Sequence, residues 1–226
     1  MSKLVEKILN EAKIITFANP KDSNFIVLIG SPGAGKSFIK DNFLHLDNFK
    51  NLNVDNWIEM IGRQKNLNLN NPENTSEINK NYEDKYKVFR TNFIKNQLKT
   101  SKPINIVVDI TGKSIESVNK VLNLVNDSNY TTTLVYVVTS KEECLKRNLS
   151  RIRTIPEDFL ISIYDDIQKT YTQIFSQFDN VWIVSNNDLW NTFYGNEEYV
   201  IIDGKKILKS REGSFERPID RIFKVK

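Results

Sequence analysis

The sequence is poor in the residues that cross-link small proteins or bind zinc. Among its 226 residues there is one cysteine, Cys144, and one histidine, His45. A single cysteine forms no intramolecular disulfide, and no cysteine cluster is present to bind zinc. No apolar run approaches the ~20 residues of a membrane span, and the first residues lack the layout of a signal peptide. These absences predict a reducing, cytoplasmic setting and no membrane partner.

No excess of charge of one sign extends over most of the chain. Residues 1–202 hold 24 Lys and Arg against 24 Asp and Glu, whereas residues 203–226 hold 8 against 4. The net charge of +4 therefore comes entirely from the last segment. Affinity for nucleic acid would have to come from a local groove or from this basic segment.

The clearest motif that is present is a complete G-x-x-x-x-G-K-S phosphate-binding loop, Gly30-Ser31-Pro32-Gly33-Ala34-Gly35-Lys36-Ser37. It follows an apolar run over 25–29 that is typical of a buried strand, and it precedes a helical pattern that begins with Phe38. Curled backbone N–H groups and a helix N-terminus bind phosphate. We expect the eight loop residues and Phe38 to contact ATP, with Lys36 on the β- and γ-phosphates and Ser37 on Mg²⁺.

Strand-like runs alternate with helical patterns along the chain. The expected strands cover 24–29, 51–54, 104–109, 132–138 and 181–184. This alternation predicts the α/β class: a P-loop NTPase or kinase fold with a five-stranded, mainly parallel sheet and helices on both faces. A long helix over 76–99 is expected to place Tyr82, Tyr86, Phe89 and Phe93 on one side.

The chain is expected to divide near residue 195. Residues 1–195 would form the P-loop domain, with an N-terminal helix and a lid near 147–156. Residues 196–226 would form a small, basic β-hairpin extension, because two apolar runs flank Asp203-Gly204.

Two aspartates follow predicted strands. Asp55 follows the run 51–54 and Asp109 ends the run 104–109, so both should reach the edge of the sheet where ligands bind. Asp55 is the candidate general base toward a hydroxyl, and its alternative role is that of a helix cap or first-turn aspartate. Asp109 is expected either to hold Mg²⁺ with Ser37 or to contact the acceptor.

The residues after Asp109 separate the classes of protein that use such a loop. A motor ATPase commonly has a glutamate next, and here Ile110 follows. A GTPase has D-x-x-G, which the segment 109–112 matches, but no N-K-x-D guanine motif follows. A phosphotransferase fits better, and a nucleotide-binding module without chemistry is the alternative.

A phosphotransferase needs cations that cover the transferring phosphoryl group. Arg147 and Arg151 are four residues apart, so they share one helix face, and Arg153 follows before a break at Ile155-Pro156. This pattern predicts a lid over the nucleotide. The alternative is a solvated basic helix end.

Taken together, these segments resemble the kinase domain of phage 5′-hydroxyl polynucleotide kinase. The resemblance is carried in order by 30–37, 51–55, 107–111 and 145–151, with Lys-Arg-Asn-x-x-Arg as its most specific part. It implies a P-loop kinase that moves the γ-phosphate of ATP to the 5′-hydroxyl of DNA or RNA. Asp55 would be the base, Asp109 would help bind the acceptor, and Arg147 and Arg151 would act on the nucleotide.

The acceptor side departs from that family. The family has an arginine three residues after the base, where this chain has Ile58, and Arg63 is the candidate replacement. The segment Thr111-Gly112-Lys113 is similar to one in the zeta-toxin kinases, which phosphorylate an amino-sugar nucleotide. Thr111 is thereby a predicted acceptor contact. The acceptor and the oligomeric state stay open.

Overall fold

The fold is described over residues 23–43, 49–69, 71–150, 155–187, 190–194, 199–202 and 205–208 of a computed structural model. The strands are β1 (Ser23–Ile29), β2 (Phe49–Asn53), β3 (Asn105–Asp109), β4 (Tyr130–Val138), β5 (Asn180–Asn187), β6 (Trp190–Tyr194), β7 (Tyr199–Ile202) and β8 (Lys205–Leu208). The helices are α2 (Lys36–Phe43), α3 (Val54–Gln64), α4 (Pro72–Gln97), α5 (Ile115–Leu122), α6 (Lys141–Leu149) and α7 (Glu157–Ile174), which the short 3₁₀ helix η1 (Phe175–Gln177) follows. The predicted N-terminal helix and His45 lie outside the described residues.

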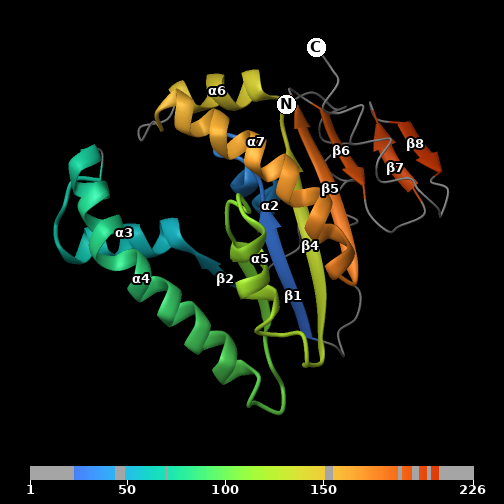
Figure 1. The fold of residues 1–226 in the computed structure, drawn as a ribbon, viewed down its shortest axis with the longest axis horizontal. Coiled ribbons are helices and arrows are strands. Elements are labelled where there is room, and N and C mark those ends of the chain that lie inside the picture. The colour runs from blue at the N-terminus through green and yellow to red at the C-terminus, as the bar shows by residue number, and fades with distance from the viewer. Residues whose placement is uncertain are drawn as a thin grey trace.

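All the described strands belong to one sheet, in the order β2-β3-β1-β4-β5-β6-β7-β8 (Figure 1). The first five of these strands pair in parallel, which confirms the predicted α/β class and its parallel sheet. The strands β5 to β8 pair antiparallel, and β7 with β8 forms the expected hairpin. The sequence did not predict β6, which joins that hairpin to the parallel strands. The division of the chain at residue 195 stays a prediction.

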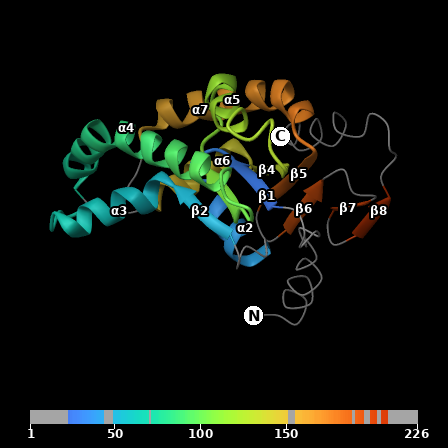
Figure 2. The same ribbon diagram turned by 90° about the horizontal axis from the view of Figure 1, so that it is seen from below.

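The central strand β1 is buried because helices cover both faces of the sheet (Figure 2). Alternate β1 side chains face two separate apolar clusters. Val27 packs in the cluster that Ile94 of α4 and residues of α5 and α7 complete. Leu28 packs in the cluster that Ile39 of α2 and Cys144 of α6 complete. The sheet thus forms a rigid platform, with the loop after β1 at its carboxyl edge.

A pair of helices, α3 and α4, stands beside the β2 edge of the sheet (Figure 1). The strand β2 ends at Asn53, whose side-chain oxygen accepts the Asp55 N–H at 2.6 Å and caps α3. Asp55 therefore lies in the first turn of a helix rather than directly after the strand. Asn71 caps α4 in the same way, so this helix begins four residues before the expected position. None of the described helices combines the length and apolar character that a membrane crossing requires.

Candidate active site

The phosphate-binding loop connects β1 to α2. Gly33 and Gly35 have φ angles of +86° and +85°, which glycine adopts without strain. Gly33 also packs directly on α6, because a Cβ atom there would lie 2.5 Å from the carbonyl oxygen of Cys144. The Thr139 hydroxyl donates to the Ala34 carbonyl at 2.9 Å. The segment from β4 to α6 therefore holds the shape of the loop.

Lys36 begins α2 with its ammonium group folded back over the loop. Its Nζ donates to the Gly30 carbonyl at 2.9 Å and lies 3.9 Å from Asp109 Oδ1. Ser37 follows on the exposed side of the same helix end. The positive end of the helix dipole favours anions there. The predicted phosphate contact and the predicted cation ligand thus lie at one helix end.

Asp109 is a buried carboxylate between the loop and β2. Only 6% of the residue is exposed, and its Oδ2 accepts a hydrogen bond of 2.7 Å from the Asn53 amide. Burial raises the pKa of Asp109, Lys36 opposes that rise, and the charge of Asp55 adds to it. Asp109 therefore lies beside Lys36 of the loop, at the carboxyl end of β3.

Asp55 is exposed, and the same asparagine links it to Asp109. The amide nitrogen of Asn53 donates to the Asp109 carboxylate, while its oxygen accepts the backbone N–H of Asp55. The position three residues later, Ile58, is 4% exposed and packs with Ile78 of α4. Where the related kinases have an arginine, this chain has a core side chain.

The α6 helix packs on the loop through Cys144. Burial raises the pKa of the Cys144 thiol to about 11, and Arg147 and Lys36 both lie near enough to oppose the rise. Arg147 Nε donates to Glu143 at 2.8 Å. Arg147 therefore pairs along its own helix, and its action on the nucleotide stays a prediction. Arg151 and Arg153 lie outside the described residues, so the lid stays a prediction.

Asn148 joins the two ends of the predicted lid segment. Its buried side chain donates to the Ile155 carbonyl at 2.7 Å and accepts the Ile155 N–H at 3.0 Å. The Lys-Arg-Asn-x-x-Arg segment therefore contains a structural asparagine beside its arginines.

Sequence reasoning missed a polar cluster between α3 and α4. Three of its atoms are buried without a hydrogen-bond partner in the described part of the chain: Trp57 Nε1, Tyr86 Oη and Arg90 Nε. Burial raises the pKa of Tyr86 to about 12, Arg90 opposes the rise, and Asp109 and Asp55 add to it. Because Trp57 follows Asp55 by two residues in α3, the cluster adjoins the helix turn that holds Asp55.

The signal for this cluster was present but ambiguous. Tyr86 belongs to an aromatic series at helical spacing, which by itself indicates only an apolar side. The Trp57 ring stacks on Phe89 at 5.2 Å and lies 5.9 Å from the Tyr86 ring, so the apolar interpretation is correct for the rings. It overlooked the polar atoms that those rings carry.

Three further predicted contacts lie at different distances from the loop. The Thr111 carbonyl accepts the Gly30 N–H at 3.3 Å, so Thr111 adjoins the loop. Phe38 is 48% exposed on α2. Arg63 pairs with Glu59 at 3.5 Å and lies at the far end of α3, ~12 Å along the helix from Asp55. The structure does not bring Arg63 to Asp55.

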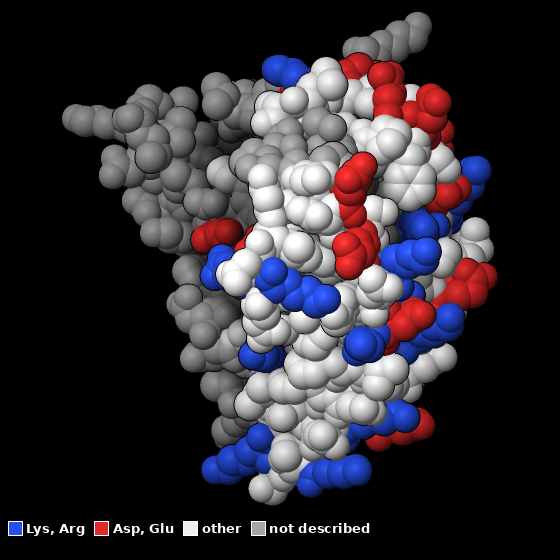
Figure 3. All heavy atoms as spheres, turned by 90° about the vertical axis from the view of Figure 1, so that its left-hand side faces the viewer, with Lys and Arg blue, Asp and Glu red and all other residues white. Residues whose placement is uncertain are grey.

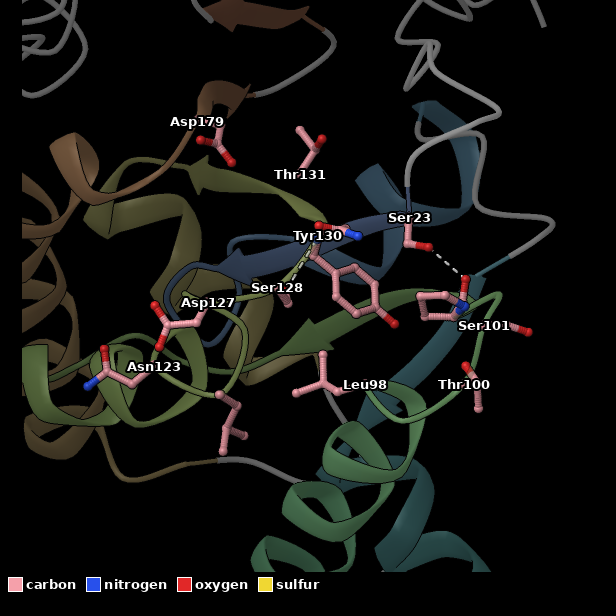
Figure 4. Close-up of a pocket in the computed structure, with 13 residues that line it drawn as sticks. Ser23, Leu98, Thr100, Ser101, Asn123, Asp127, Ser128, Tyr130, Thr131 and Asp179 are labelled. Atoms are coloured by element: carbon pink, nitrogen blue, oxygen red, sulfur yellow. Dashed lines mark hydrogen bonds between the residues drawn. The ribbon is translucent and has the colours of Figure 1, made fainter.

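An open pocket of about 910 Å³ lies at the opposite edge of the sheet (Figure 4). Ser23, Tyr130 and Asp179 line it at the amino ends of β1, β4 and β5. The polar groups there bond within the protein: the Tyr130 hydroxyl donates to the Ile104 carbonyl at 2.7 Å, and Asp179 accepts from Thr132 at 2.8 Å. Ligands of such sheets bind at the carboxyl edge, so this pocket lies away from the candidate nucleotide site.

The donor set near the loop suits Mg²⁺. The described part of the chain has no group of three or more His, Cys, Asp or Glu that could hold a metal ion. The Ser37 hydroxyl and the Asp109 carboxylate are oxygen ligands, which Mg²⁺ prefers, and it usually completes its shell with phosphates and water. Such a site forms together with the nucleotide rather than before it.

Solved structures share this fold. A chain of the Pnkp1/Rnl/Hen1 RNA repair complex aligns with a TM-score of 0.53 and 18% identity, over 88% of this chain and 52% of that one, so this chain spans about half its length. A chain of the PezAT toxin-antitoxin system of Streptococcus pneumoniae aligns with 0.59 and 15%, over 99% and 86%. The AvrRxo1-ORF1:-ORF2 complex with ATP aligns with 0.56 and 15%, over 95% and 71%. These likenesses confirm the predicted P-loop kinase-like fold.

Sequence comparison identifies the family but no close relative. No curated protein matches the chain. A family model described as an AAA domain matches residues 25–174, from β1 to the end of α7. That span includes the loop, both aspartates and Arg147, and it is well over half of the sequence. The chain therefore belongs to the AAA domain family.

Proposed function

We propose that this protein is a phosphotransferase that moves the γ-phosphate of ATP to a hydroxyl group. One observation carries the proposal: a row of contacts connects the loop to the candidate base. Lys36 Nζ lies 3.9 Å from Asp109, Asp109 accepts from Asn53 at 2.7 Å, and Asn53 caps the turn that holds Asp55. Phosphoryl transfer needs such a carboxylate beside the phosphate site.

In the proposed reaction, the acceptor oxygen forms a bond to the γ-phosphorus, the bond to the β-phosphate oxygen breaks, and ADP leaves. Asp55 takes the proton of the acceptor hydroxyl. Lys36, Arg147 and Arg151 stabilise the charge on the transferring group. Mg²⁺ bound through Ser37 would neutralise part of the phosphate charge, and Asp109 would support that ion or orient the acceptor.

The residue after Asp109 argues against direct ATP hydrolysis by a motor-type site. Ile110 donates its N–H to the Leu28 carbonyl at 3.0 Å and packs against the core. It supplies no carboxylate that could activate water. An inactive nucleotide-binding module differs in one measurable way, because it would bind ATP and transfer nothing.

For the acceptor, we propose the 5′-hydroxyl of a polynucleotide, with an amino-sugar nucleotide as the alternative. The fold likeness to a chain of an RNA repair complex supports the first, and the likeness to a toxin-antitoxin system supports the second. Basic and acidic side chains are interspersed on the face that α3 and α4 present (Figure 3). Acceptor binding there should therefore depend on local contacts more than on a general positive field.

The test is Asp55→Asn with γ-labelled ATP and a panel of 5′-hydroxyl DNA, 5′-hydroxyl RNA, nucleosides and amino-sugar nucleotides. We expect transfer to fall by roughly 10²- to 10⁴-fold, while ATP binding measured by titration calorimetry stays unchanged. Asp84→Asn, at an exposed position of α4, is the matched control and should transfer normally. Full transfer by Asp55→Asn would remove Asp55 from the mechanism.

A further inference from the structure

The contact between α3 and α4 holds buried polar atoms that have no hydrogen-bond partner among the described residues. Trp57 Nε1, Tyr86 Oη and Arg90 Nε are three of the six orphaned buried side-chain atoms found in the described residues. We call these three residues the α3–α4 wall. Leaving a buried donor without a partner destabilises the folded protein, so such atoms are uncommon unless a ligand or another group binds them.

Tyr86 presents a neutral donor beside the helix turn that holds the candidate base. Its ring lies 5.9 Å from the ring of Trp57, which follows Asp55 by two residues in α3. Tyr86 is 4% exposed. Burial raises the pKa of its phenol to about 12, and the nearby charges of Asp109 and Asp55 add to the rise. The hydroxyl therefore keeps its proton at neutral pH. A hydroxyl-bearing acceptor that binds at Asp55 would supply an oxygen that accepts the hydrogen bond of this phenol.

Arg90 presents a cation on the same wall. Its guanidinium carbon lies 5.8 Å from the centroid of the Tyr86 ring, and none of the ion pairs found between described residues includes it. The guanidinium stays charged in proteins, and its preferred partners are carboxylates and phosphates. With no carboxylate of the described residues paired to it, an anionic group of a ligand is the partner that fits.

We propose that the α3–α4 wall binds the acceptor, and that the acceptor is a sugar hydroxyl compound that carries a phosphate ester. Tyr86 donates to an acceptor oxygen beside Asp55, and Arg90 binds the phosphate ester. The inference rests on the proposed phosphotransfer. Both candidate acceptors share this chemistry, since a 5′-hydroxyl nucleotide and an amino-sugar nucleotide each carry a hydroxyl and a phosphate.

The first test replaces Tyr86 by Phe. If the hydroxyl serves the acceptor, its removal should raise the KM for the acceptor roughly tenfold and leave the KM for ATP unchanged. The melting temperature should stay equal or rise, because a buried orphan is removed, and a purely structural role for the hydroxyl would lower it. Tyr171→Phe is the matched control: it removes another orphaned hydroxyl, which is stacked on Tyr136 in the core, and it should leave both KM values unchanged.

The second test replaces Arg90 by Met, which keeps an apolar stem. We expect the KM for a nucleoside 3′-monophosphate or for UDP-N-acetylglucosamine to rise about 10- to 100-fold, whichever of the two takes label. The KM for the uncharged nucleoside should stay the same. Lys87→Met removes one positive charge from the exposed side of the same helix and should change none of these values.

A binding measurement separates this inference from the phosphotransfer. Trp57 belongs to the wall, so a phosphorylated acceptor should change its fluorescence, and Trp57→Phe identifies its signal against Trp182 and Trp190. Normal acceptor KM values in both Tyr86→Phe and Arg90→Met would overturn the wall and leave the kinase assignment standing. A fluorescence change that depends on Arg90, without any transfer, would support the α3–α4 wall and overturn the kinase assignment. If the acceptor causes no fluorescence change and no transfer is detected, both the α3–α4 wall and the kinase assignment are overturned.

Discussion

The donor and acceptor sides of this site differ in whether their polar groups have hydrogen-bond partners among the described residues. On the donor side, Lys36 bonds to the Gly30 carbonyl and Thr139 bonds to the Ala34 carbonyl, so the loop has its internal partners before a ligand arrives. On the acceptor side, Tyr86 and Arg90 have buried atoms without a partner. A phosphate is bound mainly by backbone N–H groups, which require a preformed loop. A particular acceptor is recognised by side chains, which keep their polar atoms for it.

The largest expected effect comes from breaking the donor side. Gly33→Ala forces a non-glycine residue to a φ of +86° and places its Cβ 2.5 Å from a backbone oxygen of α6. The strain is of the order of 1–3 kcal/mol, so we expect ATP affinity to fall up to ~100-fold in titration calorimetry.

The matched control is Gly62→Ala on the acceptor side. A Cβ there would meet only side-chain atoms of Leu69, the nearest at 2.7 Å, and such a side chain can move. ATP affinity should stay unchanged. Equal losses of ATP affinity in the two variants would contradict the idea that only the donor side needs a preformed backbone.

A smaller effect is expected from the asparagine that closes the lid segment. Asn148→Ala removes both hydrogen bonds to Ile155, so the free energy of unfolding should fall by about 1–3 kcal/mol in urea denaturation. Asn126→Ala removes one exposed hydrogen bond and should change it little. Equal stability of Asn148→Ala and wild type would show that Asn148 does not anchor the segment.

The smallest effect concerns Asp109, where the two sides meet. Burial raises the pKa of this carboxyl, so the native protein binds its proton more tightly than the unfolded chain does. The stability contribution of Asp109 therefore falls as the pH rises from the ordinary value of 3.8 through the raised native value. Asp109→Asn should melt at a higher temperature than wild type at pH 7, with a difference that closes in acid.

Asp127→Asn, at an exposed position, is the control for that pH series and should follow the wild type. A lower melting temperature of Asp109→Asn at pH 7 would mean that the contacts with Lys36 and Asn53 outweigh the burial of the charge. Asp109 would then count with the donor side, where the polar groups have hydrogen-bond partners within the protein.

The sequence predicted those elements whose signal is local. The loop after β1 follows from eight consecutive residues, and the parallel strands follow from apolar runs between helical patterns. The second strand was predicted to reach Val54 but ends at Asn53, because the side chain of Asn53 caps α3 through one hydrogen bond. The strand β6 was not predicted, because it pairs with β5 through a register that composition does not reveal.

The sequence by itself determined the phosphate loop, the candidate base and the arrangement of the parallel sheet, since each depends on neighbouring residues or on a regular period. Only the tertiary structure decided that Asn53 connects Asp55 to Asp109, and that Tyr86 and Arg90 have buried polar atoms without a partner among the described residues. The physical reason is distance along the chain. Asn53 and Asp109 are 56 residues apart, and whether a buried polar atom has a partner depends on what the folded chain packs against it.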